Sequence, residues 1–414
     1  MRKEEFYREA LPDSRGPLEG FRVLEATNVA AGPLAGTLLA DLGAESVKCE
    51  MPGKGDLLRQ VTHCQVEGPS ELDRSAYYLS INRNKKCITL NLKHPEGQEL
   101  FRRLARHVDV VIENFKPGTM EGWGLGYQEI RKVKPDIIYT SVSGYGQYGP
   151  YSHRPGYDHI GQAMGGLMSI TGYPDGPPTK TGHAVADNLG GWQGAFGTLA
   201  ALVHRMKTGR GQHVDVNLVD AILYTTTFGI MGAANAGWHW ERCGNRHPLA
   251  SPSNTFPCRD GWVIMAVASD SHWAKLCRLM GREALIADPR TASPALRAAN
   301  WQFVEGEVAA WTQGNTVAEV VDRFEEAGLV ASPILSFEEI VQDPHFRERE
   351  MVAEVEHPTA GPLKLFGVAS KYSLTPARVH APAPLLGQHN EEVYGGWLEL
   401  TSEEMGRLRE KGVI

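Results

Sequence analysis

The chain has 414 residues, of which 42% are hydrophobic and 22% are charged, and it carries a formal net charge of −7. This balance is typical of an ordinary globular protein, and the length predicts two domains. The negative charge argues against nucleic acid as the main partner, while a local basic patch for a phosphate-bearing ligand stays open.

Strand and helix signals alternate through the first half of the chain. Short apolar strands are predicted at 21–25, 45–50, 87–92, 108–112, 136–142 and 213–217, and helices at 33–43, 97–107, 127–132 and 192–207. This alternation predicts a parallel α/β sheet with helices on its faces.

The second half predicts a smaller unit between two connectors. Residues 221–244 are irregular and are predicted to be a connector. A sheet restarts at 262–267 with helices at 271–280 and 301–312, and this second α/β unit is expected to end near 360. After a second connector at 361–385, a short helix is expected to begin with Ser402 as its N-cap.

The sequence carries no sign of export or membrane insertion. No apolar run reaches the roughly 18 residues that a membrane span needs, and the charged start leads into no apolar signal segment. The six cysteines form no Cys-x-x-Cys pair, so we expect reduced thiols in a cytoplasmic protein, with no metal cluster.

One glycine motif suggests a dinucleotide site only superficially. Gly144-Tyr-Gly-Gln-Tyr-Gly149 follows a predicted strand and matches Gly-x-Gly-x-x-Gly. Pro150 and Pro155 follow, which opposes the helix whose N-terminus would hold a pyrophosphate. The segment is therefore interpreted as a flexible loop on the substrate side.

Two other segments each allow a structural and a functional interpretation. Asn82–Lys86 brings three positive charges together, as a solvated turn or as a basic lip for phosphates. Glu113–Gly118 follows a strand end, where parallel sheets bind ligands, but it also fits an ordinary turn.

Asp187 stands just before the helix expected near Trp192. By default an aspartate in this place caps the helix, and spacing alone favours that role. A helix N-terminus also keeps a carboxylate ionised, and an ionised carboxylate can attack a thioester. Gly190 and Gly191 would leave room for the backbone and supply N–H groups for an oxyanion.

Taken in order, these segments resemble the class III CoA-transferases, the family of formyl-CoA transferase and carnitine CoA-transferase. The resemblance rests on Gly16-Pro-Leu-Glu-Gly-Phe-Arg-Val-Leu-Glu, Ala31-Gly-Pro, Gly43-Ala-Glu-Ser-Val-Lys-Cys-Glu, Asn82-Arg-Asn-Lys, Glu113-Asn-Phe-Lys-Pro-Gly, Ser141-Val-Ser-Gly-Tyr-Gly, Gly156-Tyr-Asp, Ala186-Asp, Lys207-Thr-Gly-Arg-Gly-Gln and Pro384-Leu-Leu-Gly-Gln-His. Each motif is weak singly, but their order and spacing together are specific.

The resemblance implies a Rossmann-like large domain built from both ends of the chain, a smaller α/β domain, and an interlocked dimer. The implied boundaries are 1–220 for the large CoA-binding domain, 221–244 for a linker, 245–360 for the small domain, 361–385 for a second linker and 386–414 for the return to the large domain.

The resemblance also implies the site. The nucleophile falls on Asp187, with no metal and no permanently bound cofactor, because a coenzyme A thioester is the substrate. The implied CoA contacts are Val29, Ala30, Ala31, Ile81, Asn82, Arg83, Asn84, Lys85, Asn114, Phe115, Lys116, Ser143, Gly144, Tyr145 and Gly146. Met51 and Gly122 replace two arginines of formyl-CoA transferase, and Ala30 replaces a glutamine, so Lys85, Lys86 or Lys116 is expected to compensate. The glycine-rich loop of formyl-CoA transferase has no match in 245–262, which argues against formate and oxalate as substrates.

The implied reaction moves CoA from an acyl-CoA such as succinyl-CoA to a carboxylic acid, through an aspartyl anhydride and an aspartyl-CoA thioester. Aromatic side chains favour an aromatic or branched acceptor; these are Tyr145, Tyr148, Trp192, Trp238 and Trp240. Substituted succinates such as benzylsuccinate fit this description. The transferase for benzylsuccinate has two related subunits, so a heterodimer with a related chain stays open beside a homodimer.

Two alternatives remain. α-Methylacyl-CoA racemases share the fold but carry Gly-His-Asp, whereas this chain has Gly156-Tyr157-Asp158, and tyrosine is a poor base near neutral pH. A catalytically silent subunit of a hetero-oligomer is the other alternative, and the presence of Asp187 argues against it.

Overall fold

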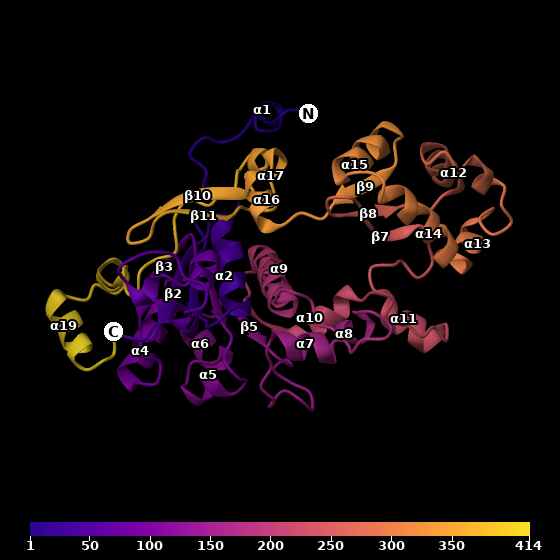
Figure 1. Ribbon diagram of the computed structural model, residues 1–414. Coiled ribbons are helices and arrows are strands. Elements are labelled where there is room, and N and C mark those ends of the chain that lie inside the picture. Colours follow the sequence, from indigo (N-terminus) through magenta and orange to yellow (C-terminus); the bar gives the residue numbers. More distant parts are fainter. The chain divides into compact units, whose positions relative to one another are not determined.

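The computed structural model describes residues 1–414, which form two compact units (Figure 1). The first unit comprises Met1–Leu167, Lys180–Ala236 and Pro344–Ile414, and the second comprises Met168–Thr179 and Gly237–Asp343. None of the helices is both long and apolar enough to cross a bilayer.

A six-stranded parallel sheet forms the centre of the first unit. Its strands are β1 (Arg22–Ala26), β2 (Glu45–Glu50), β3 (Lys85–Thr89), β4 (Val110–Glu113), β5 (Ile138–Ser143) and β6 (Gln212–Asn217), in the order β3-β2-β1-β4-β5-β6. This is the strand order of a doubly wound Rossmann sheet, in which the succession of strands changes direction between β1 and β4. The predicted parallel α/β fold is thereby confirmed.

Alternate side chains of each strand point to opposite faces of the sheet and build two cores. Val23, Ile112 and Ile138 face one core, which is completed by α2 (Ala31–Asp41) and α9 (Val185–Thr208). Leu24 and Val111 face the other, which includes α4 (Pro95–Ala105) and α6 (Tyr127–Val133). The shorter helices of this unit are α1 (Lys3–Phe6), α3 (Ala76–Ile81), α5 (Thr119–Gly122), α7 (Asp158–Met164), α10 (Leu218–Thr225), α11 (Phe228–Asn235), α17 (Pro344–Glu348), α18 (Gly396–Leu398) and α19 (Ser402–Glu410).

Segments from the end of the chain complete the second of these cores. Val393, Tyr394 and Met405 are buried in it together with Leu100 and Leu104 of α4. The side chain of Asn390 accepts a hydrogen bond from the Thr89 N–H at 2.9 Å, and the Tyr394 hydroxyl donates to the Thr89 carbonyl at 2.7 Å. The capping box of α19 uses Thr401 and Glu404, so the expected N-cap at Ser402 is wrong by one residue.

The second unit has an antiparallel sheet of its own. Its strands β7 (Ser253–Pro257), β8 (Trp262–Ala266) and β9 (Val330–Pro333) lie in that order, and helices pack against one face of it through a buried cluster that includes Trp273 and Phe324. The helices are α12 (Asp270–Leu279), α13 (Pro294–Ala299), α14 (Trp301–Thr312), α15 (Val317–Glu326) and α16 (Phe337–Gln342), while α8 (Leu167–Ile170) lies at the boundary between the two units.

The observed division differs from the expected boundaries. Residues 168–179, expected in the large domain, and residues 237–244, expected in the linker, belong to the second unit. Residues 221–225 and 228–235, expected as part of a connector, lie in α10 and α11. In α10, Leu218, Ala221 and Ile222 are buried at helical spacing behind the Asn217 cap. The second unit ends at Asp343, so the hairpin of β10 (Val352–His357) and β11 (Gly361–Phe366) belongs to the first unit.

Candidate active site

A cavity of about 320 Å³ opens at the carboxyl ends of β1, β4 and β5. Parallel α/β sheets bind their ligands at this edge, where the strand order reverses. The lining residues are Asn28, Val29, Ala30, Ala31, Leu57, Asn114, Phe115, Lys116, Pro117, Val142, Ser143, Gly144, Arg154, Pro155, Gly156, Tyr157, Asp187 and Leu218.

The cavity brings together most of the predicted site residues. Nine of them line it, namely Val29, Ala30, Ala31, Asn114, Phe115, Lys116, Ser143, Gly144 and Asp187. Tyr145 and Gly146 continue the loop after Ser143 but are not among the lining residues. Three residues at the site were not among the predicted site residues: Asn28 and Arg154 line the cavity, and Asp158, quoted only as part of a family motif, contacts the backbone beside Asp187.

Two loops of the cavity wall are clamped to each other by their asparagines. The Asn28 N–H donates to the Asn114 side-chain oxygen at 2.8 Å, and the Asn114 amide donates back to the Asn28 carbonyl at 2.8 Å. Val29 follows with a φ of 63°, a left-handed conformation that is rare for a β-branched residue. The backbone N–H of Val29 donates to the Asp56 carboxylate at 3.1 Å, and this hydrogen bond stabilises the strained conformation. Strained backbone of this kind is common at functional sites.

Asp187 is the third residue of α9 and not its cap. The helix begins at Val185 behind Ala184, which provides no side-chain cap. Asp158, the first residue of α7, fills that role: its carboxylate accepts hydrogen bonds from the N–H groups of Ala186 at 2.8 Å and Asp187 at 3.4 Å. The side chain of Asp187 is therefore not needed to cap its own helix and faces the cavity.

The electrostatics of Asp187 also differ from the expectation. Burial, with the Asp158 carboxylate as a second cause, raises the pKa of Asp187 to about 7. The sequence predicted that the helix N-terminus would keep this carboxylate ionised, and desolvation outweighs that effect here. A poorly solvated carboxylate with a raised pKa is a stronger base and a stronger nucleophile than an ordinary aspartate.

The expected oxyanion role of Gly190 and Gly191 is wrong. Both lie inside α9, where backbone N–H groups serve the helix itself. A Cβ on Gly191 would lie 2.9 Å from the Leu34 Cβ, and one on Gly190 would lie 2.6 Å from Leu218. These glycines let α2 and α10 approach α9 closely.

No residue of the segment Ile81–Lys85 lines the cavity. Arg83 is 1% exposed and forms an ion pair with Asp41 at 2.7 Å, while Lys85 pairs with Glu25 at 2.9 Å. The side-chain oxygen of Asn84 accepts hydrogen bonds from the N–H groups of His380 and Ala381. The segment is therefore neither the solvated turn nor the exposed basic lip that its charges allowed, and contact between this segment and CoA stays a prediction.

The cavity contains one carboxylate and two cations. Asp187 is the carboxylate, and Lys116 and Arg154 are the cations. No histidine lines it, and Tyr157, which is 62% exposed, stands where a racemase would carry one. The aromatic residues expected near the acceptor, Tyr145, Tyr148, Trp192, Trp238 and Trp240, are all outside the lining, and Phe115 and Tyr157 provide its aromatic surface.

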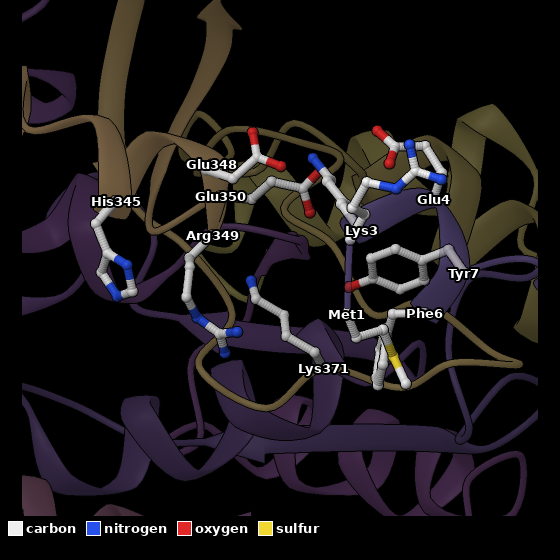
Figure 2. Close-up of a pocket in the computed structure, with 11 residues that line it drawn as sticks. Met1, Lys3, Glu4, Phe6, Tyr7, His345, Glu348, Arg349, Glu350 and Lys371 are labelled. Carbon is white, nitrogen blue, oxygen red and sulfur yellow. The ribbon is translucent and has the colours of Figure 1, made fainter.

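A larger cavity of about 900 Å³ lies between the N-terminal segment and residues 345–371 (Figure 2). It contains none of the predicted site residues. Two of its lysines already have partners within the protein, since Lys3 pairs with Glu350 at 2.9 Å and Lys371 donates to the Val368 carbonyl at 2.7 Å. The chemistry therefore points to the smaller cavity beside Asp187.

Comparison with known proteins agrees with the fold and the site. The profile of CoA-transferase family III matches residues 18–390. The chain is 40% identical to succinyl-CoA–D-citramalate CoA-transferase of Chloroflexus aurantiacus, over 96% of this chain and 98% of the relative. It is 39% identical to succinate–glutarate CoA-transferase of Agrobacterium fabrum, over 92% and 96%. A crystal structure of a CaiB/BaiF family protein from Brucella suis matches 92% of this chain and 100% of its own, with a TM-score of 0.83 and 34% identity.

The doubly wound fold and these relatives together define an enzyme that moves CoA between an acyl-CoA and an acid. The chain belongs to CoA-transferase family III, as the sequence resemblance predicted.

Proposed function

We propose that this protein transfers CoA from succinyl-CoA to a dicarboxylic acid, a substituted succinate included, with Asp187 as the nucleophile. The observation that carries the proposal is the position of Asp187, which shares one cavity with the loops expected to hold CoA. The relatives from Chloroflexus and Agrobacterium, whose names specify succinyl-CoA or succinate with citramalate or glutarate, support the choice of acids.

In the proposed mechanism, Asp187 exchanges the acyl groups in four steps. Its carboxylate attacks the donor thioester carbonyl, the C–S bond breaks, and a mixed anhydride and CoA thiolate form. The thiolate attacks the aspartyl carbonyl and expels the donor acid, which leaves an aspartyl-CoA thioester. The acceptor carboxylate displaces the thiolate to form a second anhydride. The thiolate then attacks the acceptor carbonyl and frees Asp187.

The residues around Asp187 have supporting roles in this proposal. Lys116 supplies a cation for the phosphates of CoA, and the clamped loop of Asn114 and Phe115 lines the path of the pantetheine. The Gly144 N–H is a candidate donor to the carbonyl oxygen as negative charge develops on it. We expect the enzyme to act in the cytoplasm.

A transfer assay tests the proposal. The purified chain is incubated with succinyl-CoA, glutaryl-CoA or acetyl-CoA against a panel of mono- and dicarboxylic acids, and products are read by mass spectrometry. We expect new acyl-CoA species with succinyl-CoA and dicarboxylic acids. An inactive chain that gains activity only with a related subunit would instead identify a silent subunit. Enzyme-dependent deuterium uptake at the α-carbon of a 2-methylacyl-CoA in D₂O would favour the racemase.

We also propose that the enzyme works as an interlocked dimer. One face of α9 exposes large apolar side chains at helical spacing: Trp192 (47% exposed), Phe196 (68%), Val203 (50%) and Met206 (72%). A contiguous apolar stripe on a protein surface marks an interaction site. Sedimentation should give a dimer for the wild type, and Phe196→Glu should shift it toward the monomer. A stable, active wild-type monomer at low concentration would contradict the proposal, and a requirement for a second chain would indicate the heterodimer.

A further inference from the structure

Arg154 lies on a loop that is firmly held at the cavity. The backbone N–H of Arg154 donates to the Tyr151 carbonyl at 2.9 Å, and the ring centroids of Tyr145 and Tyr151 lie 6.1 Å apart in an edge-to-face contact. Gly144 and Gly156 touch backbone to backbone, since a Cβ on either glycine would come within 2.6 Å of the other's Cα. The cation is thus presented to the cavity from an anchored loop.

The guanidinium of Arg154 has no carboxylate partner. Its contact is with the ring of Tyr151, where its central carbon lies 3.9 Å from the ring centroid. A cation stacked on an exposed ring still presents its N–H edge, and the stacking contributes only about 0.5–1 kcal/mol. The exposed Arg154 is therefore free to bind an anion that enters the cavity.

The two cations of the cavity suit different anions. Lys116 follows the loop after β4, is exposed and forms no ion pair, and an ammonium group binds phosphate as a compact point charge. Arg154 precedes Asp158, the residue that holds the backbone of Asp187, by four positions. Its planar, two-pronged donor edge matches a carboxylate.

We propose that Arg154 binds the distal carboxylate of the acyl group, the one that does not take part in transfer, and so selects dicarboxylic over monocarboxylic substrates. This inference rests on the proposed function and adds the residue that determines the class of acid. A succinyl group places its free carboxylate a short chain away from the thioester carbonyl that Asp187 attacks. Arg154, which lines the same cavity as Asp187, provides the positive charge for it.

The test compares two acyl groups of the same length that differ only at their far end. Wild type, Arg154→Gln and Arg154→Lys are assayed with succinyl-CoA and butyryl-CoA as donors to the same acceptor. We expect Arg154→Gln to lower kcat/KM for succinyl-CoA by about 10- to 100-fold, the worth of a charged hydrogen bond. For butyryl-CoA the change should stay within about threefold. Arg154→Lys should retain part of the selectivity.

The matched control is Arg131→Gln, because Arg131 is also exposed and stacked on a tyrosine, Tyr127, but lies outside the cavity. An equal loss for both thioesters would overturn the inference and assign Arg154 to the coenzyme. Unchanged selectivity, or a wild type that uses butyryl-CoA as well as succinyl-CoA, would overturn it too. If Arg154→Gln does not fold, the wild-type selectivity and the Arg154→Lys variant decide. A wild type that transfers no CoA at all refutes the proposed function itself.

Discussion

Replacing Asp187 with asparagine is expected to lower CoA transfer by at least about a thousandfold, because the amide cannot form the anhydride. The fold should persist, since Asp158 and not Asp187 bonds the start of α9. CoA binding should persist as well, because the loops of Asn28 and Asn114 do not depend on this side chain. Steady-state transfer rates, circular dichroism and CoA titration measure the three properties.

Chemical trapping locates the same step. Hydroxylamine added with an acyl-CoA should convert Asp187 to its hydroxamate and inactivate the enzyme, and without acyl-CoA it should have no effect. Asp220→Asn is the matched control, because Asp220 is likewise the third residue of a helix, α10, and lies outside the cavity lining. Substantial activity in Asp187→Asn, or a hydroxamate elsewhere in the chain, would mean that the mechanism is wrong.

Removing the charge of Asp158 is expected to change the pH dependence of the enzyme. The nucleophile must be ionised, and the pKa of Asp187 is about 7, so kcat/KM should rise with pH around neutrality and level off above it. The Asp158 carboxylate is one cause of that raised pKa. Asp158→Asn should therefore move the rising limb to lower pH, while its amide oxygen can still accept the hydrogen bond from Ala186.

Asp158→Ala separates the charge from the hydrogen bonds. It removes both, so we expect the same direction of pH shift together with a loss of about 0.5–2 kcal/mol in the free energy of unfolding, as for a lost helix cap. At a pH where kcat/KM has levelled off, activity should fall by about 10- to 100-fold, because the first turn of α9 loses the hydrogen bonds from Ala186 and Asp187 to the Asp158 carboxylate. The control for removal of a charge is Asp220→Asn, which should leave the pH profile unchanged. If the rise of kcat/KM occurs at the same pH in both Asp158 variants as in the wild type, the proposed role of Asp158 is contradicted.

The sequence argument succeeded where the signal is local. The strands of the large sheet and helices such as α14 follow from runs of apolar residues that the structure buries. It failed at the start of α9, because Gly190 and Gly191 weaken helix propensity, whereas close packing against α2 and α10 makes small residues favourable there. Tertiary contacts decided that boundary.

Both interpretations of the charge run at 82–86, a solvated turn and a basic lip, failed for a related reason. A run of charged residues such as Asn82–Lys86 is usually solvated. The neighbouring sequence does not reveal the buried carboxylates with which Arg83 and Lys85 form ion pairs. Asp41 lies 42 residues from Arg83, and Glu25 lies 60 residues from Lys85. Asp158 was overlooked similarly, because its partner Ala186 is 28 residues away. The family resemblance located Asp187, but only three-dimensional contacts identify what holds it.

The return of the chain's last segment to the first core bears on how the protein is made. Asn390 and Thr89 bond across a separation of 301 residues, and the whole second unit is synthesised between them. During translation, the part of this core that Val393, Tyr394 and Met405 cover must remain exposed until those residues leave the ribosome. Contacts so distant along the chain also slow folding. The nascent protein is therefore expected to expose apolar surface for most of its synthesis and to depend on chaperones more than a protein with local contacts.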